Sequence, residues 1–410
     1  MKKIALMHYA YPPNVGGVEL LLQEHAKILN SFGYKVTVIT GNGKSDNADI
    51  DLVEVEKIQS ILRFDPGLYE KIVTKGIVDK DFFTLVGDIK GKIEKYLDEQ
   101  DIIIIHNILS LIHNLPLNYY LKEYIKNNPQ KKYIIWVHDQ TFIDKGAIID
   151  KKEGVELGVE TRKILFEPIE NAVYVTISET LKKLFSKVMK MPKDRIIVIP
   201  NGINIKSFLE IDNAIWEFAG KYKLLSRFPV VLSPVNILER KNIDYCIDVV
   251  KSLKEKYPDI AYIISGQPSK HRNTEKYLNR INLQISKNNL TDNVFFATKL
   301  IGKTLSNEEV RDLYNISDLV FYFTKGENFG LPVIESCLLK TPIFVSDLEV
   351  FHEIGGELMN YIDYKTVAPK EAAKKIIKML ESNEIVALSY KTRNKYNLET
   401  IIKEKLVPHF

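Results

Sequence analysis

Cysteine is scarce in this chain, with two residues among 410. Cys246 and Cys337 lie far apart in sequence and inside apolar patterns. This excludes a disulfide framework and fits a reducing compartment, so we expect a cytoplasmic protein. Clusters of cysteine and histidine, and the spacing H-x-x-x-H, are also missing. We therefore expect no protein-bound metal.

Long apolar runs are missing as well, since none approaches the roughly 20 residues that span a membrane. The N-terminal stretch "MKKIALMHYAYPP" contains an apolar run that is too short for a signal peptide and predicts a strand instead. Charge of one sign is not in large excess either, because 57 basic and 53 acidic residues leave a net charge of +4. This mild balance argues against nucleic acid as a partner.

The chain instead has short runs rich in Val, Ile, Tyr and Phe that alternate with longer segments of helical period. Such unbroken runs are typical of strands that are covered on both faces. The alternation predicts α/β architecture with parallel sheets and crossover helices, and the length predicts about two domains. The predicted strand segments are 3–9, 34–40, 101–106, 132–138, 172–178, 195–200, 228–235, 259–266, 293–298, 318–324 and 341–346.

Two of the helical segments, 17–33 and 242–257, show a clear apolar face. The alternation loosens over 45–100 and 140–170, which are polar and irregular and predict loops or insertions at a sheet's carboxyl edge. Residues 201–227 lack a clear strand, so we place the domain boundary there. The C-terminal "ETIIKEKLVPHF" predicts a helical tail.

A glycine pair follows the first predicted strand, in "YAYPPNVGGVE". Gly16 and Gly17 would let a ligand lie against the backbone at the start of a helix, where an anion is favoured. A tight strand-to-helix turn is the alternative. The dinucleotide fingerprint G-x-G-x-x-G is absent, and the second strand ends in Thr40 and Gly41 rather than an acid, which argues against an NAD-dependent enzyme.

Histidines follow two of the predicted strands. His138, with Asp139 after it, and His106 lie at carboxyl ends of buried strands, where open α/β sheets bind ligands. A buried structural histidine is the alternative in both cases. His8 lies inside the first strand and is expected to be packed, and His25 belongs to a helix face.

The segment "GENFGLPVIES", residues 326–336, carries the most specific pattern. Gly326 and Gly330 free the backbone, and Pro332 early in a helix leaves nearby amides unpaired. Glu327 and Glu335 flank these amides. Carboxylates accept paired hydrogen bonds from vicinal hydroxyls, so the arrangement suits a sugar nucleotide. Before another helix, "NILERKNID" offers Arg240 and Lys241 as cations for phosphates, or as solvated loop charges.

Together these elements resemble retaining glycosyltransferases of family 4, whose GT-B fold has two facing Rossmann-like domains with parallel sheets and a cleft between them. The resemblance runs nearly from end to end, through "YPPNVGGVE", "WVHD", "VIPNGIN", "RKNID", the E-x7-E of "GENFGLPVIE" and the final "KYNLETI". It implies an acceptor domain over 1–205, joined by a returning helix over 396–410, and a nucleotide-sugar donor domain over 206–395.

The resemblance also implies roles for the matched positions. Glu335 would hold the donor's ribose, Glu327 would face the transferred sugar, and His138 would contact that sugar. Lys241 would neutralise the diphosphate leaving group without a metal or other cofactor. The implied catalytic residues are His138, Glu327 and Lys241. The implied donor site comprises Gly16, Gly17, Asn236, Arg240, Lys241, Glu327, Asn328, Phe329, Gly330, Leu331 and Glu335.

One position departs from the family pattern. The family usually has an arginine five residues before the lysine, and Asn236 stands there. An amide brings no charge to the diphosphate. Three interpretations follow: a hexosyltransferase in which Arg240 substitutes, a retaining phosphorylase on the same fold, or a catalytically silent sugar-nucleotide-binding subunit.

The acceptor hydroxyl is expected to meet the N-terminal domain, where 45–100 and 140–170 would shape its pocket. A lysine-rich stretch, "LKKLFSKVMKMPKDR" over 181–195, predicts either a solvated helix face or a surface that docks on the inner face of an anionic membrane.

Overall fold

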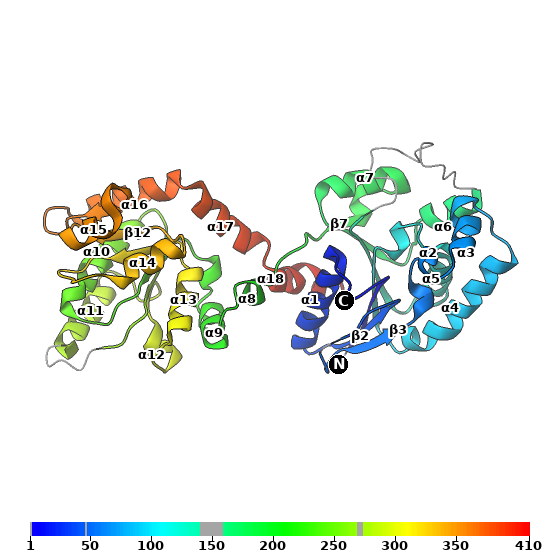
Figure 1. The fold of residues 1–410 in the computed structure, drawn as a ribbon, viewed down its shortest axis with the longest axis horizontal. Coiled ribbons are helices and arrows are strands. Elements are labelled where there is room, and N and C mark those ends of the chain that lie inside the picture. Colours follow the sequence, from blue (N-terminus) through cyan, green and yellow to red (C-terminus); the bar gives the residue numbers. More distant parts are fainter. Residues whose placement is uncertain (1, 46, 140–158, 269–273) are drawn as a thin grey trace. The chain divides into compact units, whose positions relative to one another are not determined.

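The structure, a computed structural model, describes residues 2–45, 47–139, 159–268 and 274–410. It divides into two compact units, each with its own sheet (Figure 1). Unit 1 comprises Met1–Gly202 and Leu398–Phe410, and unit 2 comprises Ile203–Asn397. The predicted domains, 1–205 with 396–410 and 206–395, have nearly these bounds.

Unit 1 is built on a seven-stranded parallel sheet in the order β3-β2-β1-β4-β5-β6-β7. Its strands are β1 (Lys3–His8), β2 (Lys35–Thr40), β3 (Asp51–Glu54), β4 (Ile102–His106), β5 (Lys132–Val137), β6 (Val173–Thr176) and β7 (Ile196–Val198). Its α-helices are α1 (Gly17–Ser31), α2 (Ile61–Phe64), α3 (Pro66–Tyr69), α4 (Lys80–Asp98), α5 (Leu115–Asn127), α6 (Val159–Phe166), α7 (Glu179–Met189) and α18 (Leu398–Ile401).

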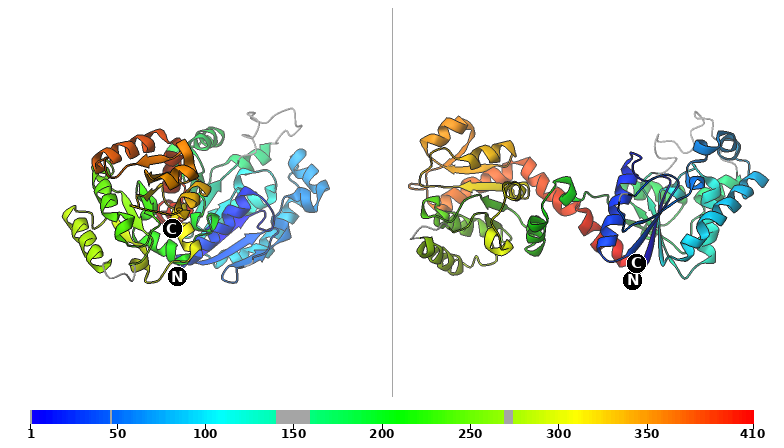
Figure 2. Two further views of the ribbon diagram at one scale, coloured as in Figure 1. Left: turned by 60° about the vertical axis from the view of Figure 1, so that its left-hand side comes forward. Right: turned by 60° about the horizontal axis from the view of Figure 1, so that its bottom comes forward.

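Both faces of this sheet are buried, because alternate strand residues point to opposite sides. Ala5 and Met7 belong to the core on one face, which also holds apolar residues of α4, α5 and α7. Ile4 and Leu6 belong to the core on the other face, with α1 and the C-terminal segment. Figures 1 and 2 show that segment, in red, beside the blue α1.

Unit 2 is built on a six-stranded parallel sheet in the order β10-β9-β8-β11-β12-β13. Its strands are β8 (Val230–Ser233), β9 (Ala261–Ile264), β10 (Val294–Phe296), β11 (Leu319–Tyr322), β12 (Ile343–Ser346) and β13 (Asn360–Ile362). Its α-helices are α8 (Ile205–Phe208), α9 (Asn213–Lys221), α10 (Ile243–Lys254), α11 (Thr274–Lys287), α12 (Ala297–Ile301), α13 (Asn307–Asn315), α14 (Leu331–Leu338), α15 (Glu349–Gly355), α16 (Pro369–Ser382) and α17 (Glu384–Lys395).

The two Rossmann-like parallel sheets confirm the predicted fold class, and every predicted strand segment contains a strand. The cleft predicted between the domains stays a prediction. The strands β3 and β13 were not predicted, because each is a short sheet edge with partly exposed residues rather than a long apolar run.

Residues 45–100 were predicted to be loops or insertions, and the loop alternative is wrong, because they contain β3, α2, α3 and α4. Residues Lys80–Asp98 form the 19-residue helix α4, which buries Phe82, Leu85, Ile89 and Ile93. Their spacing of three and four residues is an amphipathic helix pattern that the high charge of the segment obscures. In the other irregular segment, 140–158 lie outside the described residues and α6 follows them.

The lysine-rich stretch 181–195 falls largely on α7, which buries Leu181, Phe185 and Met189 and exposes Lys183 and Lys187. This is an ordinary amphipathic surface helix, and membrane docking stays a prediction. None of the helices in the described residues combines the length and the hydropathy that crossing a bilayer requires.

Candidate functional site

In unit 2, the predicted site residues gather at the carboxyl edge of the sheet between β8 and β11. These strands are neighbours there, while the chain leaves them in opposite directions along the sheet. Open α/β sheets bind ligands at such a switch point. Arg240 and Lys241 lie in a 3-10 turn, η7 (Glu239–Lys241), on the path from β8 to α10, and Glu327 follows β11.

Backbone contacts hold these two loops together. The Arg240 carbonyl accepts hydrogen bonds from the Lys325 N–H at 2.7 Å and from the Thr324 hydroxyl at 3.1 Å. Ser346, at the end of β12, donates to the Thr324 carbonyl at 2.6 Å. Sequence-distant loops are therefore fixed against each other before any ligand binds.

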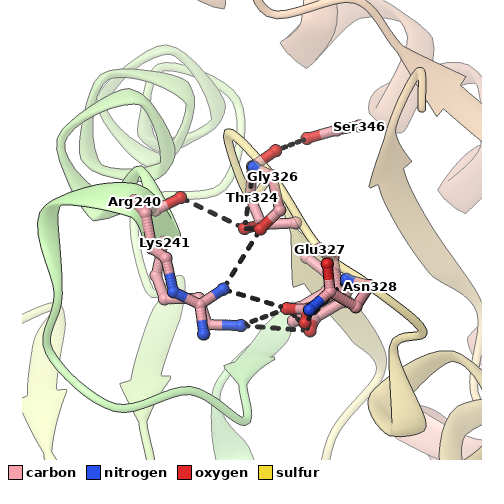
Figure 3. A network of polar contacts seen from close by, with 8 residues as sticks. Arg240, Lys241, Thr324, Gly326, Glu327, Asn328 and Ser346 are labelled. Carbon is pink, nitrogen blue, oxygen red and sulfur yellow. Dashed lines mark hydrogen bonds and ion pairs between the residues drawn. The ribbon is translucent and has the colours of Figure 1, made fainter. Parts of the chain in front are cut away.

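Glu327 is the centre of the resulting polar cluster (Figure 3). Its Oε2 lies 2.5 Å from Lys241 Nζ, 2.7 Å from the Tyr322 hydroxyl and 3.2 Å from Arg240 Nη1. Lys241 also donates to the Tyr322 hydroxyl at 3.2 Å. The other oxygen, Oε1, accepts from the Asn328 N–H at 3.3 Å. Oε2 is thus saturated by protein donors, whereas Oε1 retains capacity for a ligand hydroxyl.

The cluster keeps both charges in place. Burial alone would raise the pKa of Glu327, but hydrogen bonds from Lys241 and Tyr322 outweigh burial and lower the pKa to about 2. Burial lowers the pKa of Lys241, and the bond to Glu327 partly offsets this. Lys241 has a side-chain exposure of 10%, while Arg240 has 52%, so an incoming anion can reach the guanidinium more freely.

Unpaired backbone amides lie at the start of α14. Among the described residues, no acceptor is recorded for the N–H groups of Phe329, Gly330 and Leu331. Gly330 has a left-handed φ of +100°, and a Cβ there would lie 2.6 Å from the Phe351 ring, so only glycine fits. Gly326 has no left-handed φ, and nothing lies within 4 Å of a Cβ built there. The structure therefore gives no steric reason for the predicted role of Gly326 in freeing the backbone.

Glu335 lies one turn inside α14. Its Oε2 accepts a hydrogen bond from the buried Tyr314 of α13 at 2.8 Å. The carboxylate is exposed, and among the described residues no partner of Oε1 is recorded. The two glutamates of the E-x7-E motif are therefore each held through one oxygen by a tyrosine, from different elements.

Asn236 stands apart from this cluster. It is exposed, and its side-chain oxygen accepts from the Gln267 N–H at 3.3 Å. The cation next to Lys241 on Glu327 is Arg240.

In unit 1, the corresponding switch point lies between β1 and β4. A cavity of about 520 Å³ opens there. It is lined by His8 at the end of β1, by Tyr9 after it, by Glu19 of α1, by Asn107 after β4 and by the segment 59–69, among others. The predicted pocket-shaping segment 45–100 thus contributes to a cavity within this unit.

His138 lies at the end of β5 and is buried among rings. Its Nε2 is 3.0 Å from Nδ1 of His106, and Trp136 stacks on both imidazoles. Burial, with the fields of His25 and His8, lowers the pKa of His138 to about 3. Nδ1 of His138 and Nε2 of His106 have no hydrogen-bond partner among the described residues. The structure therefore provides a neutral histidine with an uncommitted nitrogen.

Asn107 joins the ends of β4 and β5. Its side-chain oxygen accepts from the N–H groups of His138 and Asp139 at 2.8 and 2.9 Å, and its amide donates to Asp139 Oδ2 at 3.1 Å. Its left-handed φ of +60° suits asparagine.

The Glu19 side chain occupies the space next to Gly16. A Cβ on Gly16 would lie 2.1 Å from Glu19 Oε2, whereas nothing lies within 4 Å of one on Gly17. A side chain at position 16 would require only the flexible end of Glu19 to move, because the Gly16 backbone is extended at a φ of −167°. A diphosphate approaching these amides, as predicted, would displace Glu19.

Several of these residues were not anticipated: His8, Glu19, Asn107, Tyr314 and Tyr322. For His8 a signal existed, since it ends β1 at the same kind of position that singled out His138. Tyr314 and Tyr322 gave none, because Tyr314 lies in a charged helical segment, Tyr322 lies in an apolar run, and only the fold brings their hydroxyls to the glutamates. No group of His, Cys, Asp and Glu that could hold a metal is found among the described residues.

Comparison with known proteins relates this chain to enzymes that build glycosides. Residues 215–397 match the family model of glycosyl transferases group 1. An uncharacterized glycosyltransferase of Methanocaldococcus jannaschii is 24% identical over 86% of this chain and 84% of its own length. The mannosylglucosylglycerate synthase of Thermotoga maritima is 23% identical over 85% of this chain and 81% of its own.

Among solved structures, a glycosyltransferase from Rickettsia africae covers 100% of this chain and 98% of its own, at 19% identity and a TM-score of 0.37. That likeness is too weak to transfer any residue's role. The sequence comparisons relate this chain to glycosyltransferases.

Proposed function

We propose that this protein is a retaining hexosyltransferase that moves a sugar from a nucleoside diphosphate donor to an acceptor hydroxyl, without a resident metal. The observation that carries the proposal is the Lys241–Glu327–Tyr322 cluster beside the unpaired amides of α14. Cations and free N–H groups bind phosphate oxygens, and a carboxylate with an open oxygen binds sugar hydroxyls.

The match to group 1 glycosyl transferases supports the transferase class. A hexose as the transferred group is supported by the name of the Thermotoga relative, a synthase of mannosylglucosylglycerate. In our proposal, Glu335 holds the donor's ribose, Glu327 its sugar, and the amides of Phe329, Gly330 and Leu331 its phosphates.

The proposed reaction takes place on one face of the sugar. The bond from the anomeric carbon to the diphosphate oxygen breaks while the bond to the acceptor oxygen forms, and the acceptor's proton passes to the leaving phosphate. Lys241 and Arg240, with the α14 amides, bear the charge that develops on the diphosphate. His138 is proposed to contact the sugar. Arg240 would supply the second cation that Asn236 cannot provide.

The test uses a panel of nucleoside diphosphate sugars, screened by thermal shift because a ligand that binds the native state raises its melting temperature. Release of nucleoside diphosphate in the presence of an acceptor is the expected result. Phosphate-dependent cleavage of a glycoside would establish the phosphorylase instead. Nucleotide binding without turnover of either kind would establish a silent binding subunit.

A further inference from the structure

The cavity of unit 1 contains a histidine whose protonation is fixed by the backbone. His8 has a relative exposure of 5% and lines the cavity. Its Nδ1 lies 2.9 Å from the His106 carbonyl oxygen. A carbonyl oxygen only accepts hydrogen bonds, so Nδ1 carries the hydrogen. In the neutral ring, Nε2 is then a bare acceptor.

The atom that Nε2 faces is also an acceptor. Glu19 Oε1, from the first turn of α1, lies 3.9 Å away. No other hydrogen-bond or ion-pair partner of the Glu19 side chain is recorded among the described residues. A neutral imidazole nitrogen and a carboxylate oxygen cannot bond to each other, so both need hydrogens from a third group.

We propose that this gap binds hydroxyl groups of the acceptor, with His8 Nε2 and Glu19 Oε1 each accepting one hydrogen bond. The ligand class is a polyhydroxylated molecule, a sugar or a polyol, that presents adjacent hydroxyls. This inference rests on the proposed transfer reaction, which requires an acceptor hydroxyl. The cavity volume, about 520 Å³, lies in the range of small-molecule sites. Tyr9 and Tyr69 line the same cavity and contribute aromatic, partly apolar side chains to it.

The site is sensitive to pH. Burial lowers the pKa of His8, while its bond to the His106 carbonyl and the carboxylates of Glu19 and Asp139 work in the opposite direction. His106, His113 and His138 also lie within its field. Because the net pKa is below 6.5, the ring is neutral at neutral pH. On acidification the imidazolium donates directly to Glu19, and the gap no longer binds hydroxyls.

The first test needs no acceptor. In ¹⁵N-histidine NMR of the full chain, signals lost in His8→Asn identify His8. The expected state at neutral pH is the neutral ring with hydrogen on Nδ1. An imidazolium at neutral pH would mean that His8 and Glu19 form an ion pair, and would overturn the proposal.

The same spectra test whether the gap binds hydroxyls. The probes are methyl α-D-glucoside, methyl α-D-mannoside and glycerol, at high millimolar concentration. At least one should shift the Nε2 signal, and the absence of any shift would also contradict the site.

The second test uses a matched pair of variants. His8→Asn keeps a donor for the His106 carbonyl but has no atom at the Nε2 position, whereas His8→Gln places an amide oxygen there. With the donor that the wild type turns over, we expect KM for the probe to rise about 10-fold in His8→Asn and to stay within about threefold in His8→Gln, with donor KM unchanged. An unchanged probe KM in His8→Asn would refute the site. If no donor is turned over, the proposed function fails, and the NMR shift still decides this inference.

Discussion

The two units have the same kind of sheet edge, but charged side chains lie at one edge and neutral imidazoles lie at the other. At the switch point of unit 2, Lys241, Arg240 and Glu327 are charged and bonded to one another. At the switch point of unit 1, His106 and His138 are buried and neutral, and each has a nitrogen without a partner. Parallel topology determines where a ligand binds, while the side chains at the strand ends determine which ligand. A cluster of cations suits a diphosphate, and an edge of neutral imidazoles, which both donate and accept hydrogen bonds, suits hydroxyls.

The largest expected effect comes from breaking the charged edge. Lys241→Ala or Glu327→Ala should lower kcat for sugar transfer by about 10²-fold or more, because Lys241 bears charge that develops on the diphosphate and Glu327 both holds the sugar and pairs with Lys241. Steady-state release of nucleoside diphosphate measures this, and circular dichroism checks that both variants fold. Lys256→Ala is the control, since it breaks a surface ion pair with Glu381 in the same unit. Near wild-type transfer in both test variants would refute the assignment.

Acid should unfold the two units at different pH values. In unit 1, burial lowers the pKa of His25 and His138 from 6.5 to about 3. The unfolded chain then binds more protons, so stability is lost as pH falls from about 6.5 towards 3. In unit 2, the pKa of Glu327 falls from 4.5 to about 2, so its contribution is complete above 4.5 and is lost as pH falls from 4.5 towards 2.

The chain has two tryptophans, one in each unit, and they allow this comparison to be measured. Fluorescence of Trp216→Phe reports unit 1 through Trp136, and that of Trp136→Phe reports unit 2 through Trp216. We expect unit 1 to unfold at the higher pH. The reverse order would contradict the neutral state of the buried histidines.

Tyr314 and Tyr322 allow the roles of the two glutamates in unit 2 to be tested separately. Tyr314→Phe frees Glu335 and should weaken nucleoside diphosphate binding by about 2- to 10-fold, the cost of one hydrogen bond. Tyr322→Phe removes one hydrogen bond from each of Glu327 and Lys241, and should lower kcat by a similar factor while nucleotide affinity changes less. Titration calorimetry with UDP, GDP and ADP and turnover of the matching sugar nucleotides separate the two. If Tyr314→Phe and Tyr322→Phe change nucleotide affinity and kcat equally, the two tyrosines have only a structural role.

The last prediction, of similar size, concerns the missing arginine. Arg240→Ala should lower kcat about 10-fold, because it removes one exposed cation from the phosphate site. Adding Asn236→Arg to that variant should restore part of the loss. If Arg240→Ala is silent, Arg240 is a solvated loop charge, and the second cation must be sought elsewhere.

Much of the fold was predictable because buried parallel strands read as uninterrupted apolar runs, as in 101–106 and 318–324. Edge strands and the charged α4 were not, since their burial depends on neighbours that are distant in sequence. Glu327 and Glu335 were predictable from their motif. The contacts that hold them were not, because the hydroxyls of Tyr322 and Tyr314 come from a strand and a helix that only the fold brings beside the motif. His8 was interpreted as packed, and only the cavity beside β1 distinguishes it.

The central claim is that the edge of unit 2 binds the diphosphate of a sugar nucleotide through Lys241. The most direct measurement is thermal unfolding of Trp136→Phe, followed through Trp216, with and without each nucleoside diphosphate. We predict that at least one nucleotide raises the melting temperature of unit 2, and that the added change Lys241→Ala reduces this shift. No shift with any nucleotide, or a shift that Lys241→Ala leaves unchanged, would contradict the claim.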